Sequence, residues 1–170
     1  DLTEIFKRDD VSFDIFKKLV KKGSIVRGIV TKKTKDKPRS FFDGIDKWAK
    51  EEGASGLAYF TIEKDSEIKA KGPVGKFFSS DSINEIMKIS NAEVGDSIFL
   101  ACGKVKEVEK ILANARNKIA DELKLIKNDI FAFCWIVDYP MFEEDKKNKK
   151  IIFSHNPFSM PQGNTENLDL

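Results

Sequence analysis

The chain has little of what marks a metal centre, a disulfide scaffold or a membrane protein: its 170 residues include one histidine, two cysteines and no long apolar run. One histidine and two distant cysteines, Cys102 and Cys134, provide no zinc-site spacing, so we expect no metal site. Because both cysteines lie in apolar runs, we expect buried, reduced thiols of a cytoplasmic protein rather than a disulfide. No run approaches the ~20 apolar residues of a membrane-spanning helix, and no signal peptide opens the chain, so we expect no membrane partner.

Excess charge is also small, because 30 Lys and Arg against 28 Asp and Glu leave a net charge of +2. This balance argues against a protein that binds mainly through nucleic-acid phosphates, although it allows a local basic patch. Hydrophobic residues at 41% and charged residues at 34% are typical of a globular chain. The chain begins at Asp1 without a methionine and stops soon after a motif-like segment, so we expect a piece of a longer protein.

Strand and helix patterns follow one another along residues 24–126, after one or two short helices within residues 1–22. β-branched residues predict three strands, at 24–33, at 56–65 and from Gly95-Asp96 onward. A short extended piece is expected within 68–78. Apolar residues at helical spacing predict three helices, at 40–53 beginning at Ser40, at 79–91 and at 106–126. This order predicts an α+β fold with two layers, in which the helices lie on one face of a small mixed or antiparallel sheet.

The segment KGPVGKFF, residues 71–78, is the nearest approach to a phosphate-binding loop. Such a loop needs Gly five residues before its Gly-Lys pair and Ser or Thr after it. Ala70 and Phe77 occupy those positions. We therefore expect turns around a short extended piece.

Residues 128–170 differ from the rest of the chain. FAFCWIVDYP is apolar nearly throughout, which is typical of a strand buried on both faces. IIFSHNPF is its expected antiparallel partner, and EEDKKNKK is the expected exposed tip of this β-hairpin. A hairpin of this size is too small to stand alone. It must pack on the preceding domain or on a larger sheet outside this chain, and its apolarity favours the larger sheet.

Five segments carry a resemblance to a known family. They are GASGLAY at 53–59, KGPVGKFF at 71–78, GDSIF at 95–99, WIVDYPMF at 135–142 and HNPFSMP at 155–161. In this order they resemble bacterial aspartyl-tRNA synthetases, along nearly the whole chain. The first three resemble the GAD domain that these enzymes insert into their class II catalytic domain, and the last two resemble the point of return.

The resemblance implies that residues 1–127 form the GAD insertion, with its core at about 24–126, and that residues 128–170 begin the returning catalytic segment, whose hairpin belongs to an antiparallel catalytic sheet. It implies ATP-dependent attachment of aspartate to tRNA-Asp through an aspartyl-adenylate, and it leaves open tRNA-Asn as a second substrate. The full enzyme would need ATP and Mg²⁺ and form a homodimer. The ATP-binding motifs lie outside this segment, which would hold no catalytic residue, bind no cofactor by itself and be inactive alone.

One functional position of the family's His-His-Pro-Phe motif carries over to this chain. The first histidine corresponds to His155, which the resemblance places in the aspartate pocket. The second is replaced by Asn156, a neighbour whose amide forms hydrogen bonds but never becomes cationic. The structural alternative for His155 is a hydrogen-bonded histidine at the end of an edge strand.

Two other classes of protein remain open. A GAD-type domain also occurs in the GatB subunit of tRNA-dependent amidotransferases, and such a non-catalytic module predicts no class II hairpin. A free-standing interaction domain predicts a hairpin packed on its own domain, whereas exposed Phe133, Trp135 and Ile152 would mark a severed catalytic sheet. The lysines of 32–37 and 146–150 are expected to be solvated loop charges, with contact to tRNA phosphates as the alternative. The GAD domain itself is either a tRNA-contacting appendage or a spacer.

Overall fold

The computed structural model describes residues 1–127, 129–137, 140–145 and 147–154. The chain divides into two compact units, Asp1–Ile126 and Lys127–Leu170. None of the helices in the described residues combines the length and the apolarity that crossing a membrane requires.

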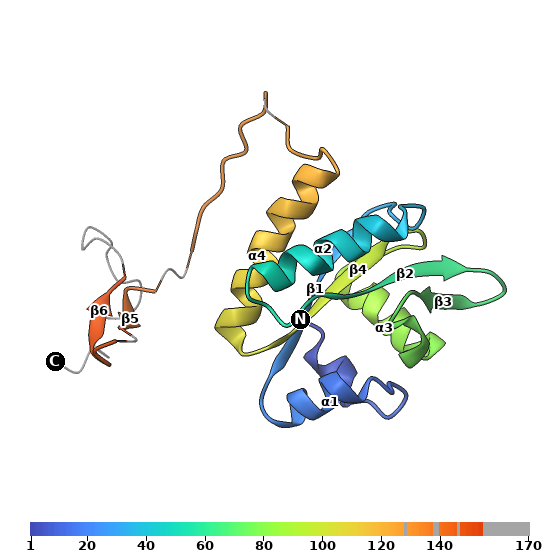
Figure 1. Ribbon diagram of the computed structural model, residues 1–170, viewed down its shortest axis with the longest axis horizontal. Coiled ribbons are helices and arrows are strands. Elements are labelled where there is room, and N and C mark those ends of the chain that lie inside the picture. The colour runs from blue at the N-terminus through green and yellow to red at the C-terminus, as the bar shows by residue number, and fades with distance from the viewer. Residues whose placement is uncertain (128, 138–139, 146, 155–170) are drawn as a thin grey trace. The chain divides into compact units, whose positions relative to one another are not determined.

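The first unit is built around a four-stranded antiparallel sheet with the strand order β1-β4-β2-β3 (Figure 1). Its strands are β1 Ile25–Thr31, β2 Ala58–Lys64, β3 Ile68–Lys71 and β4 Ser97–Gly103. Its α-helices are α1 Asp14–Lys21, α2 Arg39–Glu51, α3 Ser80–Ser90 and α4 Val105–Glu122, and its 3-10 helices are η1 Thr3–Lys7 and η2 Gly75–Phe77. The α+β class, the antiparallel sheet and the order of elements along residues 24–126 are as predicted.

The central strand β4 is apolar on both of its faces. Alternate residues of a strand point to opposite sides of the sheet, so Ile98 and Leu100 face one way and Phe99 and Ala101 the other. All four are at most 4% exposed. The two sets belong to two separate hydrophobic clusters, which means that both faces of the sheet are covered.

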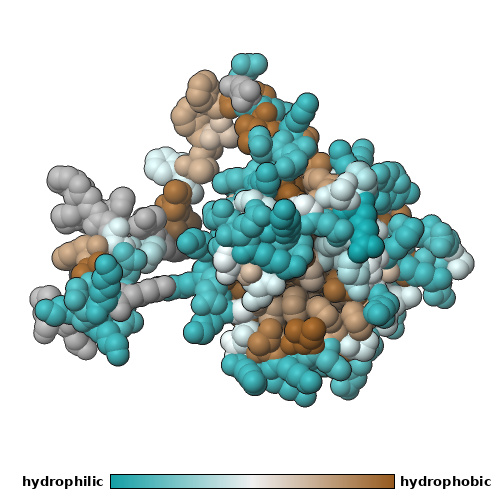
Figure 2. Space-filling view, in the orientation of Figure 1, coloured by the Kyte–Doolittle hydropathy of each residue, from teal (hydrophilic) through white to brown (hydrophobic). Residues whose placement is uncertain are grey.

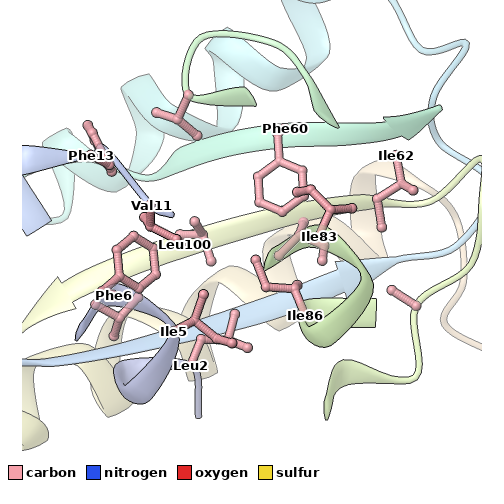
Figure 3. Close-up of a cluster of buried hydrophobic side chains, with 14 of the residues drawn as sticks. Leu2, Ile5, Phe6, Val11, Phe13, Phe60, Ile62, Ile83, Ile86 and Leu100 are labelled. Carbon is pink, nitrogen blue, oxygen red and sulfur yellow. The ribbon is translucent and has the colours of Figure 1, made fainter. Parts of the chain in front are cut away.

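The first cluster lies between the sheet and the elements η1, α1 and α3. Figure 3 shows Phe6 from η1 and Ile83 and Ile86 from α3 packed toward Phe60 and Leu100 of the sheet. Phe6 also contacts Phe78 edge-to-face, with ring centroids 5.7 Å apart. This cluster ties the N-terminal residues to the sheet.

The second cluster lies between the opposite face and the helices α2 and α4. Phe42 of α2 stacks on Tyr59 of β2, with centroids 4.6 Å apart and planes 12° from parallel, and approaches Phe99 at 5.8 Å. From α4, Val108, Ala115 and other residues of its apolar stripe complete the cluster. The long helix therefore packs on the sheet, as its 3.6-residue apolar period predicts.

The predicted placement of all helices on one face differs from the structure. Figure 1 shows α2 and α4 on one side of the sheet and α1 and α3 on the other. The reason is that β4 has large apolar side chains on both faces, and each face must be shielded from water. The unit thus has a helical layer on either side of the sheet.

A buried carboxylate holds one end of this sheet together. Asp96 is 1% exposed and accepts hydrogen bonds from the backbone N–H groups of Lys33, at 2.9 Å, and Glu93, at 2.8 Å. The Lys32 ammonium lies 3.0 Å from the same carboxylate and donates to the Asn91 carbonyl at 2.8 Å. These contacts join the loop after β1 to the loop before β4.

The environment of Asp96 makes the free energy of unfolding depend on pH. Burial raises its pKa, but the N–H groups of Lys33 and Glu93 and the Lys32 ammonium outweigh burial and set the pKa below the usual 3.8. A carboxyl group whose folded pKa is lowered stabilises the fold above its unfolded pKa, and this contribution is lost as the pH falls through the folded value. We expect the free energy of unfolding to decline as the pH drops below about 4.

Asp96→Asn is expected to lower the free energy of unfolding by about 1–3 kcal/mol at neutral pH, because it removes a hydrogen-bonded charge from a buried site. It is also expected to flatten the decline below about pH 4. Urea unfolding of the chain across this pH range measures both effects. Asp36→Asn, at an exposed position of the same loop, is the matched control. Equal stability and pH dependence of the two variants would contradict this role for Asp96.

The second unit contains a small hairpin. Its strands, β5 Phe142–Glu144 and β6 Ile151–Phe153, pair antiparallel, with Phe142 opposite Phe153. The expected partner of IIFSHNPF was the apolar run before Tyr139. The hairpin instead pairs FEE with IIF, so Glu143 and Glu144 of the expected tip lie in β5. The described residues between the strands, Asp145 and 147–150, form the turn.

The apolar run 130–137 differs from the prediction of a strand buried on both faces. Its described residues form no strand, and Phe133 and Trp135 are 97% and 94% exposed. In Figure 2 the segment that follows α4 carries brown, hydrophobic surface. A strand requires a hydrogen-bonded neighbour and an apolar layer, and neither is provided for this run by the residues that the structure describes.

Candidate functional site

The residues just before His155 form the described part of the candidate site. Phe142 and Phe153 face each other across the hairpin, with ring centroids 4.9 Å apart. Aromatic cross-strand pairs stabilise such a short ladder. The chain thus reaches His155 directly from a paired strand.

The turn of the hairpin is organised by Asp145. Its carboxylate accepts hydrogen bonds from the Lys147 N–H at 2.9 Å and from the Asn148 amide at 2.6 Å. These two donors lower the pKa of Asp145, the Lys147 N–H contributing most. Lys149 has a φ of +52°, which lets the chain reverse direction. The hydrogen bonds of Asp145 therefore stabilise the turn of the hairpin.

Ser154 fixes the point at which the chain leaves the hairpin. Its N–H donates to the Met141 carbonyl at 3.0 Å, and its hydroxyl donates to the Pro140 carbonyl. The start of one strand is therefore tied to the end of the other. The predicted site residues His155 and Asn156 come next and lie outside the described residues, so their pocket role stays a prediction.

The segment KGPVGKFF forms turns, as predicted. The chain turns at Gly72 and enters η2 at Gly75. A Cβ atom on Gly75 would lie 2.4 Å from the Ala70 carbonyl oxygen, so only glycine fits this close approach of two backbone segments. The Lys76 ammonium lies 5.1 Å from the centre of the Phe77 ring. Close packing of the backbone on itself explains these glycines.

The lysines of 32–37 are predicted to be solvated loop charges, and Lys32 differs from this prediction. Lys32 pairs with Asp96 and donates to the Asn91 carbonyl. The sequence offers one signal for this pairing, an aspartate directly before an apolar strand. The cluster belongs to the fold, since its carboxylate is occupied by three donors from the protein itself.

Residues 16–112 match the sequence profile of the GAD domain, and this match covers more than half of the chain. The chain belongs to the GAD domain family. The GAD profile spans α1 to the first half of α4 and includes the whole four-stranded sheet.

Similarity to curated proteins continues beyond the GAD domain. The chain is 70% identical over 169 residues to an aspartate–tRNA(Asp/Asn) ligase of Pelagibacter ubique, covering 99% of this chain and 28% of that protein. It is 48% identical over 170 residues to the ligase of the same name from Wolbachia pipientis subsp. Culex pipiens, and 45% identical over 169 residues to that of Beijerinckia indica. In both, the match covers 99% of this chain and 28% of the ligase. The chain therefore spans little more than a quarter of the length of these relatives.

Proposed function

We propose that this chain is part of an aspartate–tRNA ligase. The observation that carries the proposal is similarity along 99% of the chain, through the GAD domain and the hairpin alike, to proteins with that name. The whole enzyme joins aspartate to ATP, releasing pyrophosphate and forming aspartyl-adenylate. The aspartyl group then moves to the 3′ end of tRNA with release of AMP. ATP and Mg²⁺ bind elsewhere in the whole enzyme, and catalysis there depends on positioning and charge stabilisation.

Within this enzyme we assign residues 1–127 to the inserted GAD domain and residues 128–170 to the returning class II catalytic segment. Exposed apolar side chains after α4, including Phe131, Phe133 and Trp135, support the second assignment. A contiguous exposed apolar segment indicates a missing neighbour. In the whole enzyme that neighbour is the antiparallel catalytic sheet, which buries the segment.

His155 is proposed to line the aspartate pocket, with Asn156 beside it. An imidazole donates a hydrogen bond to a carboxylate and gains charge near neutral pH, which suits recognition of aspartate. The Asn156 amide also forms hydrogen bonds but stays neutral. Recognition of aspartate through charge is therefore assigned to His155, and not to its neighbour.

The relatives' names include both tRNA-Asp and tRNA-Asn, and we propose the same pair of tRNA substrates here. The full-length protein is expected to load aspartate onto purified tRNA-Asp and tRNA-Asn with kcat/KM values within about tenfold, a difference of about 1.4 kcal/mol. Charging of each tRNA with labelled aspartate measures this. Charging of tRNA-Asp alone would contradict the dual specificity and leave the ligase activity standing.

The remaining features of the whole enzyme follow from its class. We propose a homodimer that works in the cytoplasm. A GatB-like amidotransferase module and a free-standing interaction domain are not favoured, since similarity to the ligases continues beyond the GAD domain into the hairpin. Sequencing the reading frame on both sides of this chain tests the assignment: class II motifs are expected before and after it, and stop codons would contradict it.

A further inference from the structure

The sheet of the GAD domain has a notch beside the end of β4. β1 pairs with β4 along its whole length, as far as Gly103. The pairing of β2 with β4 stops at Ala58 and Leu100. Residues 101–103 therefore have a neighbouring strand on one side only, among the residues that the structure describes.

The backbone of Cys102 faces this notch. The Val26 N–H donates to the Thr3 hydroxyl at 3.0 Å, and the Val26 carbonyl accepts from the Leu2 N–H at 2.8 Å, so both groups of Val26 point away from β4. In an antiparallel pair, when one residue directs its N–H and C=O away from the partner strand, the residue directly opposite does the same. Cys102 lies opposite Val26 and thus directs its N–H and C=O toward the β2 side. Neither group has a loop or side-chain partner within the described residues.

The notch is preformed, because Asp46 holds the neighbouring chain away from it. The Asp46 carboxylate accepts the Leu57 N–H at 2.8 Å and pairs with the Lys50 ammonium at 2.6 Å. Gly56 turns the chain there with a φ of +117°, and a Cβ atom would lie 2.6 Å from Asp46 Oδ1. This anchored turn prevents β2 from continuing alongside Cys102.

A cavity of about 250 Å³ opens at the notch, between the loop 52–56 and α4. The β4 residues that face α4 here are small, Ala101 and Gly103, and the α4 wall includes the buried residues Val108 and Ile111. This volume is equivalent to about eight water molecules of liquid. The space suits one or two side chains.

Charge at the rim has an acidic excess. The lining includes the carboxylates of Glu52 and Glu107 and the ammonium of Lys110. Glu107 approaches the β4 end, since its Oε2 lies 3.8 Å from a Cβ atom built on Gly103. A ligand with a positive charge near one end complements this rim.

We propose that the notch binds a short extended peptide that pairs with β4 by strand addition. A central peptide residue donates its N–H to the Cys102 carbonyl and accepts the Cys102 N–H. The side chains of its two neighbours point toward α4 and contact Val108 and Ile111, because alternate residues share a face. Because the peptide runs antiparallel to β4, its first residues lie at the Gly103 end, and a lysine placed there lies near Glu107. This site is separate from the aspartate pocket and does not depend on the proposed ligase activity.

The test adds the blocked peptide acetyl-Lys-Val-Ser-Val-amide to the ¹⁵N-labelled 170-residue chain and follows binding by two-dimensional NMR. The Cys102 N–H is expected to shift saturably, with a dissociation constant on the order of 1 mM, as befits a small contact. The same peptide with an N-methylated serine cannot donate to the Cys102 carbonyl and is expected to bind at least about tenfold more weakly.

Three outcomes would overturn the proposal. The first two are equal binding of the methylated and unmethylated peptides, and no shift of the Cys102 N–H at concentrations well above the expected dissociation constant. The third comes from hydrogen exchange of the free chain, in which the Cys102 N–H is expected to exchange far faster than the paired Leu100 N–H. Equal protection of the two would show that Cys102 already has a partner.

Discussion

Replacing His155 with alanine in the full-length enzyme is expected to raise the KM for aspartate by about 10- to 100-fold, while the KM for ATP changes by less than about twofold. A hydrogen bond to a charged group is worth about 1.5–3 kcal/mol, which corresponds to this range. In the proposed pocket the aspartate carboxylate loses its imidazole donor, whereas ATP is proposed to bind through motifs elsewhere. Aspartate-dependent steady-state kinetics at saturating ATP, and the reverse, measure the two constants.

Two neighbouring variants serve as controls for this result. Ser154→Ala removes the hydroxyl that donates to the Pro140 carbonyl and tests whether loosening the hairpin alone has the same effect. It is expected to change both KM values by less than about fivefold, which corresponds to one neutral hydrogen bond of about 1 kcal/mol. Asn156→Ala is expected to have a smaller effect than His155→Ala, since its amide is neutral. An unchanged aspartate KM and kcat in His155→Ala would assign His155 to a structural role at the end of an edge strand.

Phe99→Ala is expected to lower the free energy of unfolding of the GAD domain by about 3–5 kcal/mol, the usual cost of removing a buried aromatic ring. Phe99 is fully buried in the central strand and lies within 6.3 Å, between ring centroids, of the rings of Phe41, Phe42 and Tyr59. Its loss leaves a cavity between the sheet and the helices α2 and α4. Urea unfolding of the 170-residue chain, followed by circular dichroism, measures the change.

Phe133→Ala is the matched control, because it removes the same ring from a position that is 97% exposed. In the 170-residue chain this substitution is expected to change the free energy of unfolding by no more than about 0.5 kcal/mol. In the full-length enzyme the same substitution is expected to cost about 3–5 kcal/mol, since the catalytic sheet buries the ring. A small effect in both proteins would contradict the assignment of residues 128–170 to the catalytic domain.

The elements of the GAD domain could be predicted from the sequence because its local patterns agree with its packing. The apolar stripe of α4 has a helical period, and its residues Val108, Ala115 and Ile119 all lie in one cluster. Ser79 caps α3 by accepting the Ser82 N–H at 3.0 Å. At α2, by contrast, the expected start at Ser40 is displaced, because Pro38 is the N-cap and its fixed φ suits the first turn.

The arrangement of the layers differs from the prediction, although the sequence contains a sign of it. The strand β4 has Ile98 and Leu100 on one face and Phe99 and Ala101 on the other, a sign that both faces are covered. The predicted one-sided sheet neglected that sign. The run 130–137 has the same apolar composition and yet forms no strand, because composition does not say whether the neighbouring strand belongs to this chain.

The candidate site could be predicted only in part. The charged tip and the antiparallel hairpin before His155 follow from alternating apolar and polar runs, and the structure contains both. The roles of Asp96 and Lys32 depend on two loops that meet only in the folded chain, so the position of Asp96 before an apolar strand does not identify its partner. The notch beside Cys102 has the same origin, since it exists only because Asp46 captures a backbone N–H eleven residues away.

Aspartate-dependent exchange of pyrophosphate into ATP tests the central claim most directly, since it detects adenylate formation without tRNA. The full-length protein is expected to catalyse this exchange with aspartate, and the purified 170-residue chain is expected to show none, because the ATP motifs lie outside it. Exchange by the 170-residue chain alone would contradict the placement of the ATP motifs outside it. No aspartate-dependent exchange by the full-length protein would contradict the assignment of this chain to an aspartate–tRNA ligase.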